Sequence, residues 1–176
     1  MNHRFRAAST ALLILFAGAA VSAQPTLRVD LKPAANRTLA PDFALADSAG
    51  KTAHIADYRG KVVLLDFWAT WCHGCKLEIP WFVQFHRAYA DKGLSVIGAA
   101  MDDEGWSVVK PFLAKTDVPY RIVTGNDALM KLYGLASLPD TFLIDKKGRI
   151  AAAYTNGLVD KENIESNIKA LLAERE

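Results

Sequence analysis

Residues 62–80 read VVLLDFWATWCHGCKLEIP, and this stretch decides the fold. Its first seven residues are apolar except for Asp66, which is the pattern of a central strand buried on both faces. Beyond Cys72 and Cys75, apolar residues recur as on one helical face as far as Tyr89. The stretch therefore predicts a buried strand, a short loop that brings in the cysteines, and a long helix.

Outward from this segment, the chain continues to alternate strands and helices. Pro80 lies inside the long helix, where we expect a kink, because proline removes a helix hydrogen bond. The further strands are expected at 43–45, 52–54, 94–100, 119–124, 141–145 and 150–154. The further helices are expected at 104–115, 126–133 and 160–173. This order predicts an α/β fold, a mixed β-sheet flanked by helices on both faces with an N-terminal β-hairpin extension.

The first 23 residues have the three parts of a secretory signal peptide. Arg4 and Arg6 precede an apolar run, which closes on the small residues of Val21-Ser22-Ala23. The alternative is an uncleaved membrane anchor, but the run is short of the ~20 apolar residues that a spanning helix needs. We therefore expect export to the periplasm with cleavage after Ala23.

The remaining chain is expected to form a tether and one domain. Residues 24–40 show no sustained period and contain two prolines, which predicts a loosely packed tether. Residues 41–176 are enough for one domain with its own core and too few for two. Without residues 1–23 the formal charge is zero, because two of the 21 basic residues leave with them and 19 acidic residues stay. No basic run appears, so we expect no nucleic acid partner.

The chain has only two cysteines, Cys72 and Cys75. A disulfide between them closes almost no loop, so it would stabilise the fold little. The pair is more plausible as a redox-active site. At the start of a helix, the Cys72 sulfur would lie beside free backbone N–H groups that favour a thiolate. Cys75 would be more buried, and it would attack the mixed disulfide that Cys72 forms with a substrate. A structural zinc site needs four ligands, and beyond residue 23 only three histidines could add to the cysteines, so we expect no metal and no cofactor besides the Cys72–Cys75 disulfide.

The segment from Phe67 to Pro80 resembles the active-site motif F-W-A-T-W-C-x-x-C-x-x-E-x-P of the TlpA/ResA branch of the thioredoxin superfamily. A second segment, LPDTFLID from Leu138, resembles the cis-proline loop of that family and the strand after it. The resemblance implies a thioredoxin-like domain from about Pro41 onward. It also implies that Pro139 is a cis-proline facing the cysteines, and the backbone of Leu138 could then pair with an extended substrate segment.

Two acidic residues near the cysteines have two interpretations each. Asp66 in a buried strand should have a raised pKa, which suits a group that takes and returns the proton of the resolving thiol. Alternatively, it reaches water or caps a turn. Glu78 lies one helical turn beyond Cys75, and the resemblance implies that it tunes the cysteines. Alternatively, it is a solvated acid in the first turn of the helix.

The residues around the cysteines suggest contacts with substrate. His73 takes a place where it could stabilise the Cys72 thiolate or contact substrate, and the proline that the family often has before the second cysteine is replaced by Gly74. Trp71 is expected on the surface as an apolar contact for partners.

The leading hypothesis is a monomeric thiol–disulfide oxidoreductase that reduces protein disulfides in the periplasm. An oxidising compartment cannot reduce the pair again, so a membrane thiol donor is implied. The resemblance implies service in cytochrome c maturation or related tasks. A thiol peroxidase is one alternative, although peroxiredoxins usually have a Thr where Ala69 stands. A copper-delivery protein is another, although such proteins often add a histidine later than His86, and this chain has none there.

Overall fold

The computed structural model describes residues 26–175. The expected signal peptide and its cleavage site after Ala23 lie outside the described residues. Among residues 26–175, no helix has both the length and the apolar character needed to cross a membrane.

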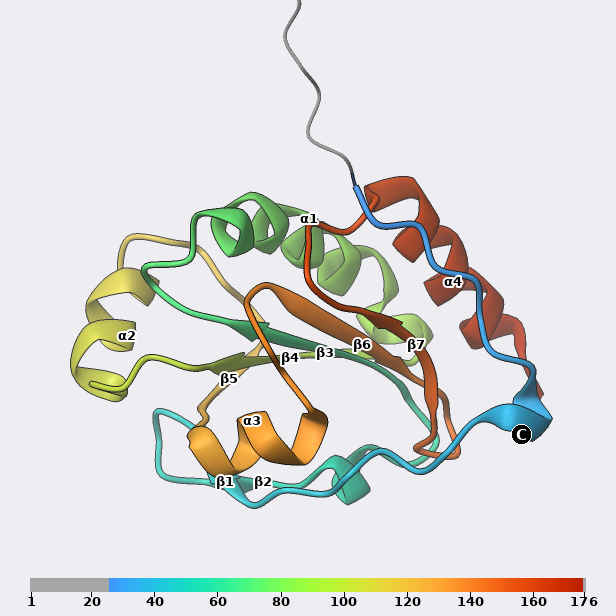
Figure 1. The fold of residues 1–176 in the computed structure, drawn as a ribbon, viewed down its shortest axis with the longest axis horizontal. Coiled ribbons are helices and arrows are strands. Elements are labelled where there is room, and N and C mark those ends of the chain that lie inside the picture. The colour runs from blue at the N-terminus through green and yellow to red at the C-terminus, as the bar shows by residue number, and fades with distance from the viewer. Residues whose placement is uncertain (1–25, 176) are drawn as a thin grey trace, which may run out of the picture.

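A five-stranded mixed sheet forms the centre of the molecule (Figure 1). Its strands lie side by side in the order β5-β4-β3-β6-β7. The strands β3, β4 and β5 are parallel, whereas β6 runs antiparallel to β3 and β7 antiparallel to β6. They comprise β3 (Val62–Trp68), β4 (Leu94–Ala100), β5 (Arg121–Thr124), β6 (Asp140–Ile144) and β7 (Ile150–Tyr154). All seven residues of the central strand β3 are buried, as its apolar sequence predicts.

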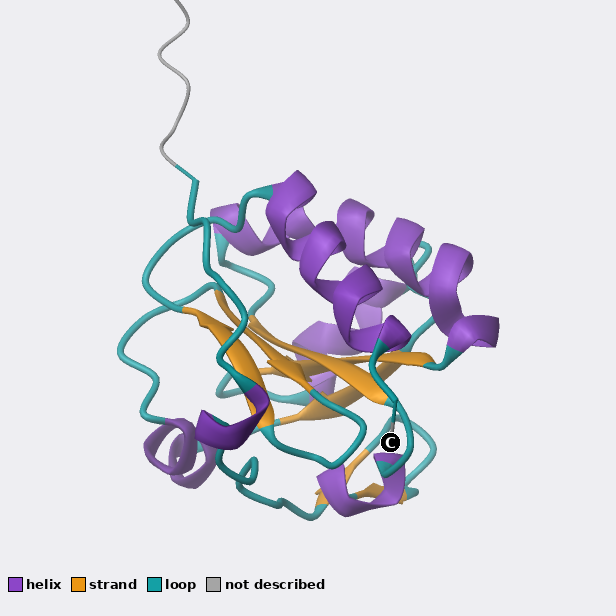
Figure 2. Cartoon of the chain, turned by 90° about the vertical axis from the view of Figure 1, so that its right-hand side faces the viewer, coloured by secondary structure: helices purple, strands orange, loops and turns teal. Residues whose placement is uncertain are grey.

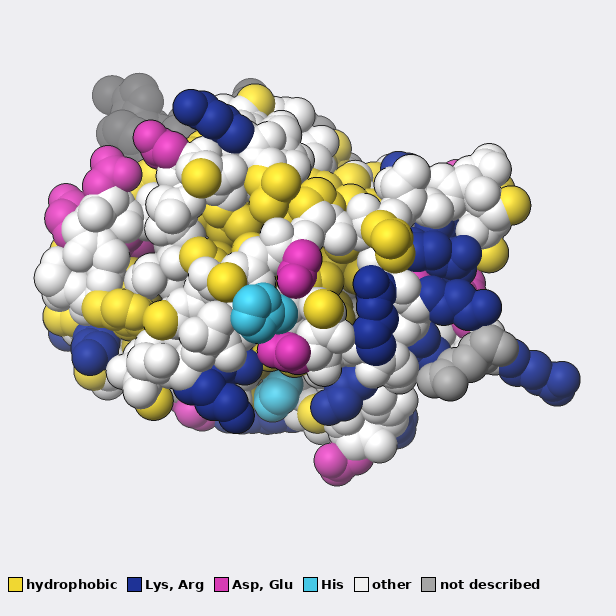
Figure 3. Space-filling model, turned by 90° about the horizontal axis from the view of Figure 1, so that it is seen from below, with side chains coloured by type: hydrophobic (Ala, Val, Ile, Leu, Met, Phe, Trp, Pro, Cys, Tyr) yellow, Lys and Arg dark blue, Asp and Glu magenta, His cyan; other side chains and the backbone are white. Residues whose placement is uncertain are grey.

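Helices cover both faces of the sheet (Figures 1 and 2). Val62, Leu64 and Trp68 of β3 point to one face, where they share a core with α1 (His73–Tyr89) and α4 (Lys161–Ala173). The alternate residues of β3 point to the other face and pack with α3 (Asp127–Tyr133) and with the hairpin of β1 (Leu45–Ala46) and β2 (Thr52–Ala53). On that second face, basic side chains are interspersed with acidic and apolar ones (Figure 3). The expected thioredoxin-like arrangement with an N-terminal hairpin is confirmed.

The helix α1 continues through Pro80 to Tyr89, and Pro80 is exposed.

Some elements differ from the expected ones at their ends. The helix α2 (Trp106–Leu113) is shorter than expected because Gly105, with φ of 55°, forms its N-cap. The ring of Phe112 in α2 packs on the ring of Trp68, with 5.1 Å between the ring centroids. This contact places α2 over the end of β3.

The expected tether differs from what we predicted, since it packs on the domain from Thr26 onward. Leu27, Val29 and Leu31 contact the core that α1 and α4 share. Their alternation with charged residues is a strand-like pattern that explains this packing. Farther along, Arg37 is buried and pairs with Asp145 after β6 and with Glu174 near the C-terminus. The segment is therefore part of the fold rather than a loose lead-in.

Candidate active site

The two cysteines lie where β3 leads into α1, and they form a disulfide. Cys72 is the N-cap of α1, and its Sγ accepts a hydrogen bond from the Cys75 N–H at 3.2 Å. In this state Cys72 is 4 % exposed and Cys75 is 1 % exposed. After reduction, the Cys75 N–H and the positive end of the helix dipole would stabilise a thiolate at Cys72. Cys72 therefore lies at the helix start, and Cys75 lies one turn inside the helix.

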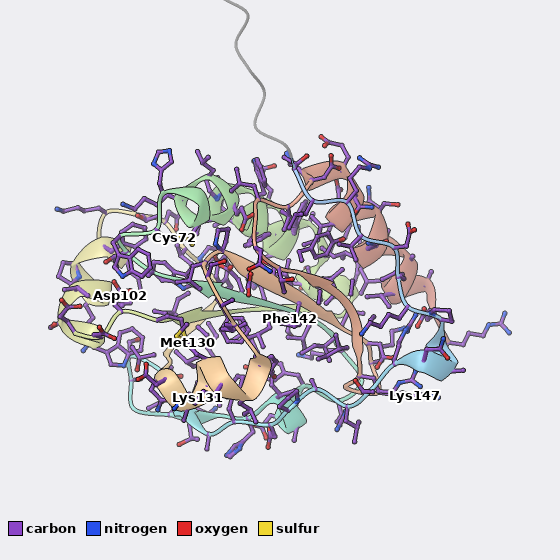
Figure 4. The ribbon with its side chains drawn as sticks, in the orientation of Figure 1. Cys72, Asp102, Met130, Lys131, Phe142 and Lys147 are labelled. Carbon is purple, nitrogen blue, oxygen red and sulfur yellow. A yellow bond between two sulfur atoms is a disulfide. The ribbon has the colours of Figure 1, made fainter. Side chains whose placement is uncertain are left out.

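The loop before the cysteines is fixed by a buried aspartate at the end of β4. Asp102 accepts hydrogen bonds from the Thr70 N–H, at 3.0 Å, and from the Thr70 hydroxyl. Cys72 and Asp102 lie at the same end of the sheet (Figure 4). Trp71, between Thr70 and Cys72 in sequence, is 67 % exposed, as expected for a contact with partners. Sequence reasoning missed Asp102, because only the folded sheet brings it beside Thr70.

Pro139 lies directly against the dipeptide that separates the cysteines. The Leu138–Pro139 peptide bond is cis. A Cβ atom added to Gly74 would lie 3.2 Å from Pro139 Cδ, so the two residues are in close contact. A groove opens beside them, and its lining consists of His73, Gly74, Leu77, Leu138, Pro139, Gly157 and Leu158. The structure thus brings Pro139, Leu138 and His73 together around one groove next to the disulfide.

Asp66 is buried in the middle of β3, on the face that α1 covers. Neither carboxyl oxygen has a hydrogen-bond partner among residues 26–175. Burial raises the pKa of Asp66 well above its ordinary value, and the nearby charge of Glu78 raises it further. The alternative interpretation, an aspartate that reaches water or caps a turn, is excluded by this environment.

Glu78 is fully buried within α1. Its Oε1 accepts a hydrogen bond from the Val159 N–H at 2.7 Å, and its Oε2 has no partner within residues 26–175. Burial raises the pKa of Glu78 to about 7; the bond from Val159 opposes that rise and the charge of Asp140 adds to it. The alternative of a solvated acid in the first turn of the helix is therefore excluded.

Asp140 is a third buried acid at the site, and sequence reasoning assigned it no role. It follows Pro139 directly, and its Oδ1 accepts a hydrogen bond from the Asn156 N–H at 2.8 Å. Burial raises the pKa of Asp140, while that hydrogen bond lowers it. Its position at the head of an otherwise apolar strand is the signal that could have pointed to it. Asp66, Glu78 and Asp140, hereafter the acidic cluster, are linked in series through Glu78.

Within residues 26–175, no group of three or more His, Cys, Asp or Glu side chains is placed to hold a metal ion. The site as described consists of the disulfide, the acidic cluster and the groove.

Comparison with known proteins identifies relatives along most of the chain. The model of the AhpC/TSA family matches residues 37–153. The thiol-disulfide oxidoreductase ResA of Geobacillus thermodenitrificans is 32 % identical over 161 residues, which cover 91 % of each chain. The thiol-disulfide oxidoreductase ResA of Bacillus thuringiensis is 35 % identical over 134 residues, which cover 75 % of this chain and 76 % of that one.

Solved structures give the same result. A crystal structure described as a thiol:disulfide interchange protein DsbE of Chlorobium tepidum superposes with a TM-score of 0.72 at 32 % identity, covering 85 % of this chain and all of that one. A thioredoxin family protein from the same species, also a thiol:disulfide interchange protein, superposes with a TM-score of 0.69 at 26 % identity, covering 78 % of this chain and 97 % of that one. The resemblance to the TlpA/ResA branch is therefore confirmed.

Proposed function

This chain belongs to the AhpC/TSA family and is a thiol–disulfide oxidoreductase, and from that premise we propose that it reduces disulfides of exported proteins outside the cytoplasm. The observation that carries the proposal is the Cys72–Cys75 disulfide at the N-terminus of α1, set against Pro139 and backed by the acidic cluster. Two sulfurs at the start of a helix, the first at the N-cap and the second one turn inside, match the two successive attacks of an exchange.

The exchange is a transfer of two electrons and two protons. In the reduced protein, the Cys72 thiolate attacks one sulfur of the substrate disulfide, and the other substrate sulfur leaves as a thiolate. Cys75 then loses its proton and attacks Cys72 Sγ. This second attack expels the substrate sulfur that is bonded to Cys72, as a thiolate, and restores the Cys72–Cys75 disulfide. The substrate leaves as a dithiol once both of its sulfurs are protonated.

The acidic cluster is proposed to serve the second step. Cys75 needs a base, because its thiolate and not its thiol is the nucleophile. Asp66 lies on the β3 face that α1 covers, and Glu78 lies one turn beyond Cys75. Carboxyls with raised pKa values can accept a proton and return it near neutral pH. We assign the proton exchange to Asp66, with Glu78 setting how readily Asp66 ionises.

The groove beside the disulfide is proposed to receive the substrate chain. Leu138, whose carbonyl lies in the cis peptide bond to Pro139, would pair with an extended segment through its backbone. Trp71 and His73 are both exposed next to Cys72 and would contact the substrate on either side. A monomer suffices for this chemistry, since all these groups come from one chain.

The source of electrons and the client remain part of the proposal. An oxidising compartment cannot reduce the disulfide again, so a thiol donor in the membrane is required. We propose apocytochrome c as the client class, because the resemblance to the TlpA/ResA branch implies service in cytochrome c maturation. The relatives compared above are named for disulfide exchange, so their names favour neither peroxide turnover nor copper delivery.

Disulfide exchange and redox potential together test the proposal. We expect the protein to reduce insulin, with a potential below about −200 mV. Cys72→Ser should abolish exchange, whereas Cys75→Ser should accumulate a mixed disulfide between Cys72 and the substrate. The matched pair separates the attacking from the resolving sulfur. Peroxide turnover or tight copper binding without any disulfide exchange would overturn the proposal.

A further inference from the structure

One wall of the groove comes from a loop outside the two sequence motifs. The loop of residues 155–160 joins β7 to α4 and contributes Gly157 and Leu158 to the lining. A Cβ atom added to Gly74 would lie 3.0 Å from Leu158 Cδ2, so this side chain packs against the dipeptide between the cysteines. A polypeptide joined to Cys72 and lying in the groove would therefore meet Leu158.

Two carboxylates hold this loop from inside the domain. The Asn156 N–H donates to Asp140, and the Val159 N–H donates to Glu78 at 2.7 Å. Both acids belong to the acidic cluster, so the wall of the groove and the groups behind the disulfide share hydrogen bonds.

The N-terminal segment of residues 26–29 holds the same loop from outside. The Leu27 N–H donates to the Leu158 carbonyl at 2.7 Å, and the Asp160 N–H donates to the Leu27 carbonyl at 2.8 Å. The Leu27 side chain also packs over Gly157, where an added Cβ atom would lie 3.4 Å away. Leu27 thus contacts every residue from 157 to 160 through backbone pairing or side-chain packing.

The segment is itself tied to α4, which makes it a firm support. The Arg28 guanidinium pairs with Asp160 at 2.7 Å. The Val29 N–H donates to Asn163 Oδ1 at 2.9 Å, and the Asn167 amide donates to the Val29 carbonyl at 2.7 Å. These contacts fix Arg28 and Val29 against the start and the first turns of α4.

We propose that residues 26–29 are a positioning segment, which holds Leu158 against Gly74 and thereby gives the site a preference for polypeptides with an apolar side chain next to the reacting cysteine. This inference rests on the proposed function, since it names the substrate class of the same site. The occupant follows from continuity with the disulfide, because a chain linked to Cys72 is what lies beside Gly74. The apolar preference follows from the lining, in which Leu77, Leu138 and Leu158 surround the groove.

The test compares two peptide probes on the full-length protein carrying Cys75→Ser. The peptides are identical except for Leu or Ser beside a single cysteine, and each cysteine is activated as a mixed disulfide with 2-nitro-5-thiobenzoate. The Cys72 thiolate forms a bond to the peptide sulfur, the probe's S–S bond breaks, and 2-nitro-5-thiobenzoate leaves with the electron pair. Its absorbance gives a second-order rate constant for each peptide.

We expect the Leu peptide to react about tenfold faster than the Ser peptide, as burial of part of a leucine side chain implies. Leu27→Pro removes the N–H that donates to Leu158 and should bring the ratio close to one. Asp30→Pro is the matched control, since Asp30 is exposed and its N–H donates no hydrogen bond within the described chain. This control should keep the wild-type ratio. Leu158→Ser, which alters the wall itself, should lower the ratio as Leu27→Pro does.

The ratio distinguishes positioning from a general loss of structure. A partly unfolded Leu27→Pro protein would slow both peptides alike and keep the ratio, which would overturn the inference. Equal rates for both peptides in the Cys75→Ser protein without further substitutions would also overturn it, while leaving the proposed function intact. If that protein releases 2-nitro-5-thiobenzoate from neither peptide, the proposed function itself fails.

Discussion

The two ends of strand β6 bury acidic side chains in opposite ways. At the end far from the disulfide, Asp145 follows the strand and accepts hydrogen bonds from Arg37 and Arg149. Arg37 also pairs with Glu174 at 2.7 Å. Burial raises the pKa of Asp145, but the hydrogen bonds from the two arginines outweigh it, so the net pKa lies below the ordinary value. Lys147, near this end, lies opposite Cys72 across the molecule (Figure 4).

At the disulfide end, the acidic cluster is buried without a cation. Within residues 26–175, no basic side chain forms an ion pair with Asp66, Glu78 or Asp140. The pKa values of all three are raised, chiefly by burial. Cations lower the pKa of a buried acid, whereas a buried acid without a cation binds its proton more tightly than a solvated one. The difference teaches that one end of β6 pairs its buried acid with cations, whereas the other end leaves its acids without cations, as the proposed proton exchange requires.

The largest expected effect is on the paired end. Arg37→Met leaves the buried Asp145 and the nearby Glu174 without one cation, and losing one partner of a buried pair costs about 4 kcal/mol. We expect the free energy of unfolding in denaturant to fall by that order. Disulfide exchange by the folded fraction should stay unchanged. If the folded fraction of the variant exchanged disulfides more slowly than the wild type, the contrast between the two ends would be removed.

The next effect is on the pH dependence of stability. The folded pKa of Glu78 is about 7, above its ordinary value of 4.5. Its stabilising contribution is therefore fully present below pH 4.5 and is lost as the pH rises through 7, a change of roughly 3 kcal/mol. Glu78→Gln removes this dependence and keeps an acceptor for Val159. Denaturant unfolding at several pH values should show the variant gaining stability relative to the wild type between about pH 5 and 8. Parallel curves would show that Glu78 titrates normally.

A kinetic effect of similar scale is expected at Asp66. Asp66→Asn keeps the shape of the side chain and removes the proposed base for Cys75, and general base catalysis is worth about a hundredfold or more. The reaction of Cys72 with an activated disulfide should be nearly unchanged, while release of the mixed disulfide by Cys75 should slow by about that factor. Stopped-flow measurement of the two phases separates them. Equal slowing of both phases would assign Asp66 a structural role.

The smallest effect sharpens the contrast within the acidic cluster. Asp140→Asn removes a charge that raises the pKa of Glu78, and it leaves an amide oxygen to accept from Asn156. The pH at which the Glu78 contribution to stability is lost should therefore move downward. We expect a change in stability of about 1 kcal/mol at neutral pH. An unchanged transition pH would mean that Asp140 is not charged when Glu78 titrates.

Local patterns in the sequence predicted the parts of the site that depend on neighbours in the chain. The strand β3, the start of α1 and the cis Pro139 all follow from short motifs. The burial of Asp66 followed from its apolar strand. The buried Glu78 did not follow, because helical spacing alone left it either solvated or inside.

Features that depend on distant contacts could not be predicted. Arg37 meets Asp145 across 108 residues of sequence, and Leu27 meets the loop before α4 from the other end of the chain. Asp140 lies near Asp66 and Glu78 only because β6 lies beside β3. A single sequence shows residue types and spacing, but it does not show which distant segments the fold brings together.

The most direct test is a titration of the carboxyl groups by NMR of ¹³C-labelled Asp and Glu in the folded protein. We predict that at least one carboxyl, lost in Glu78→Gln, titrates with a midpoint near 7, while the carboxyl of Asp145 ionises below the ordinary pKa of an aspartate. Ionisation of every Asp and Glu carboxyl by pH 5 would contradict the account, since the disulfide end would then hold no proton to exchange.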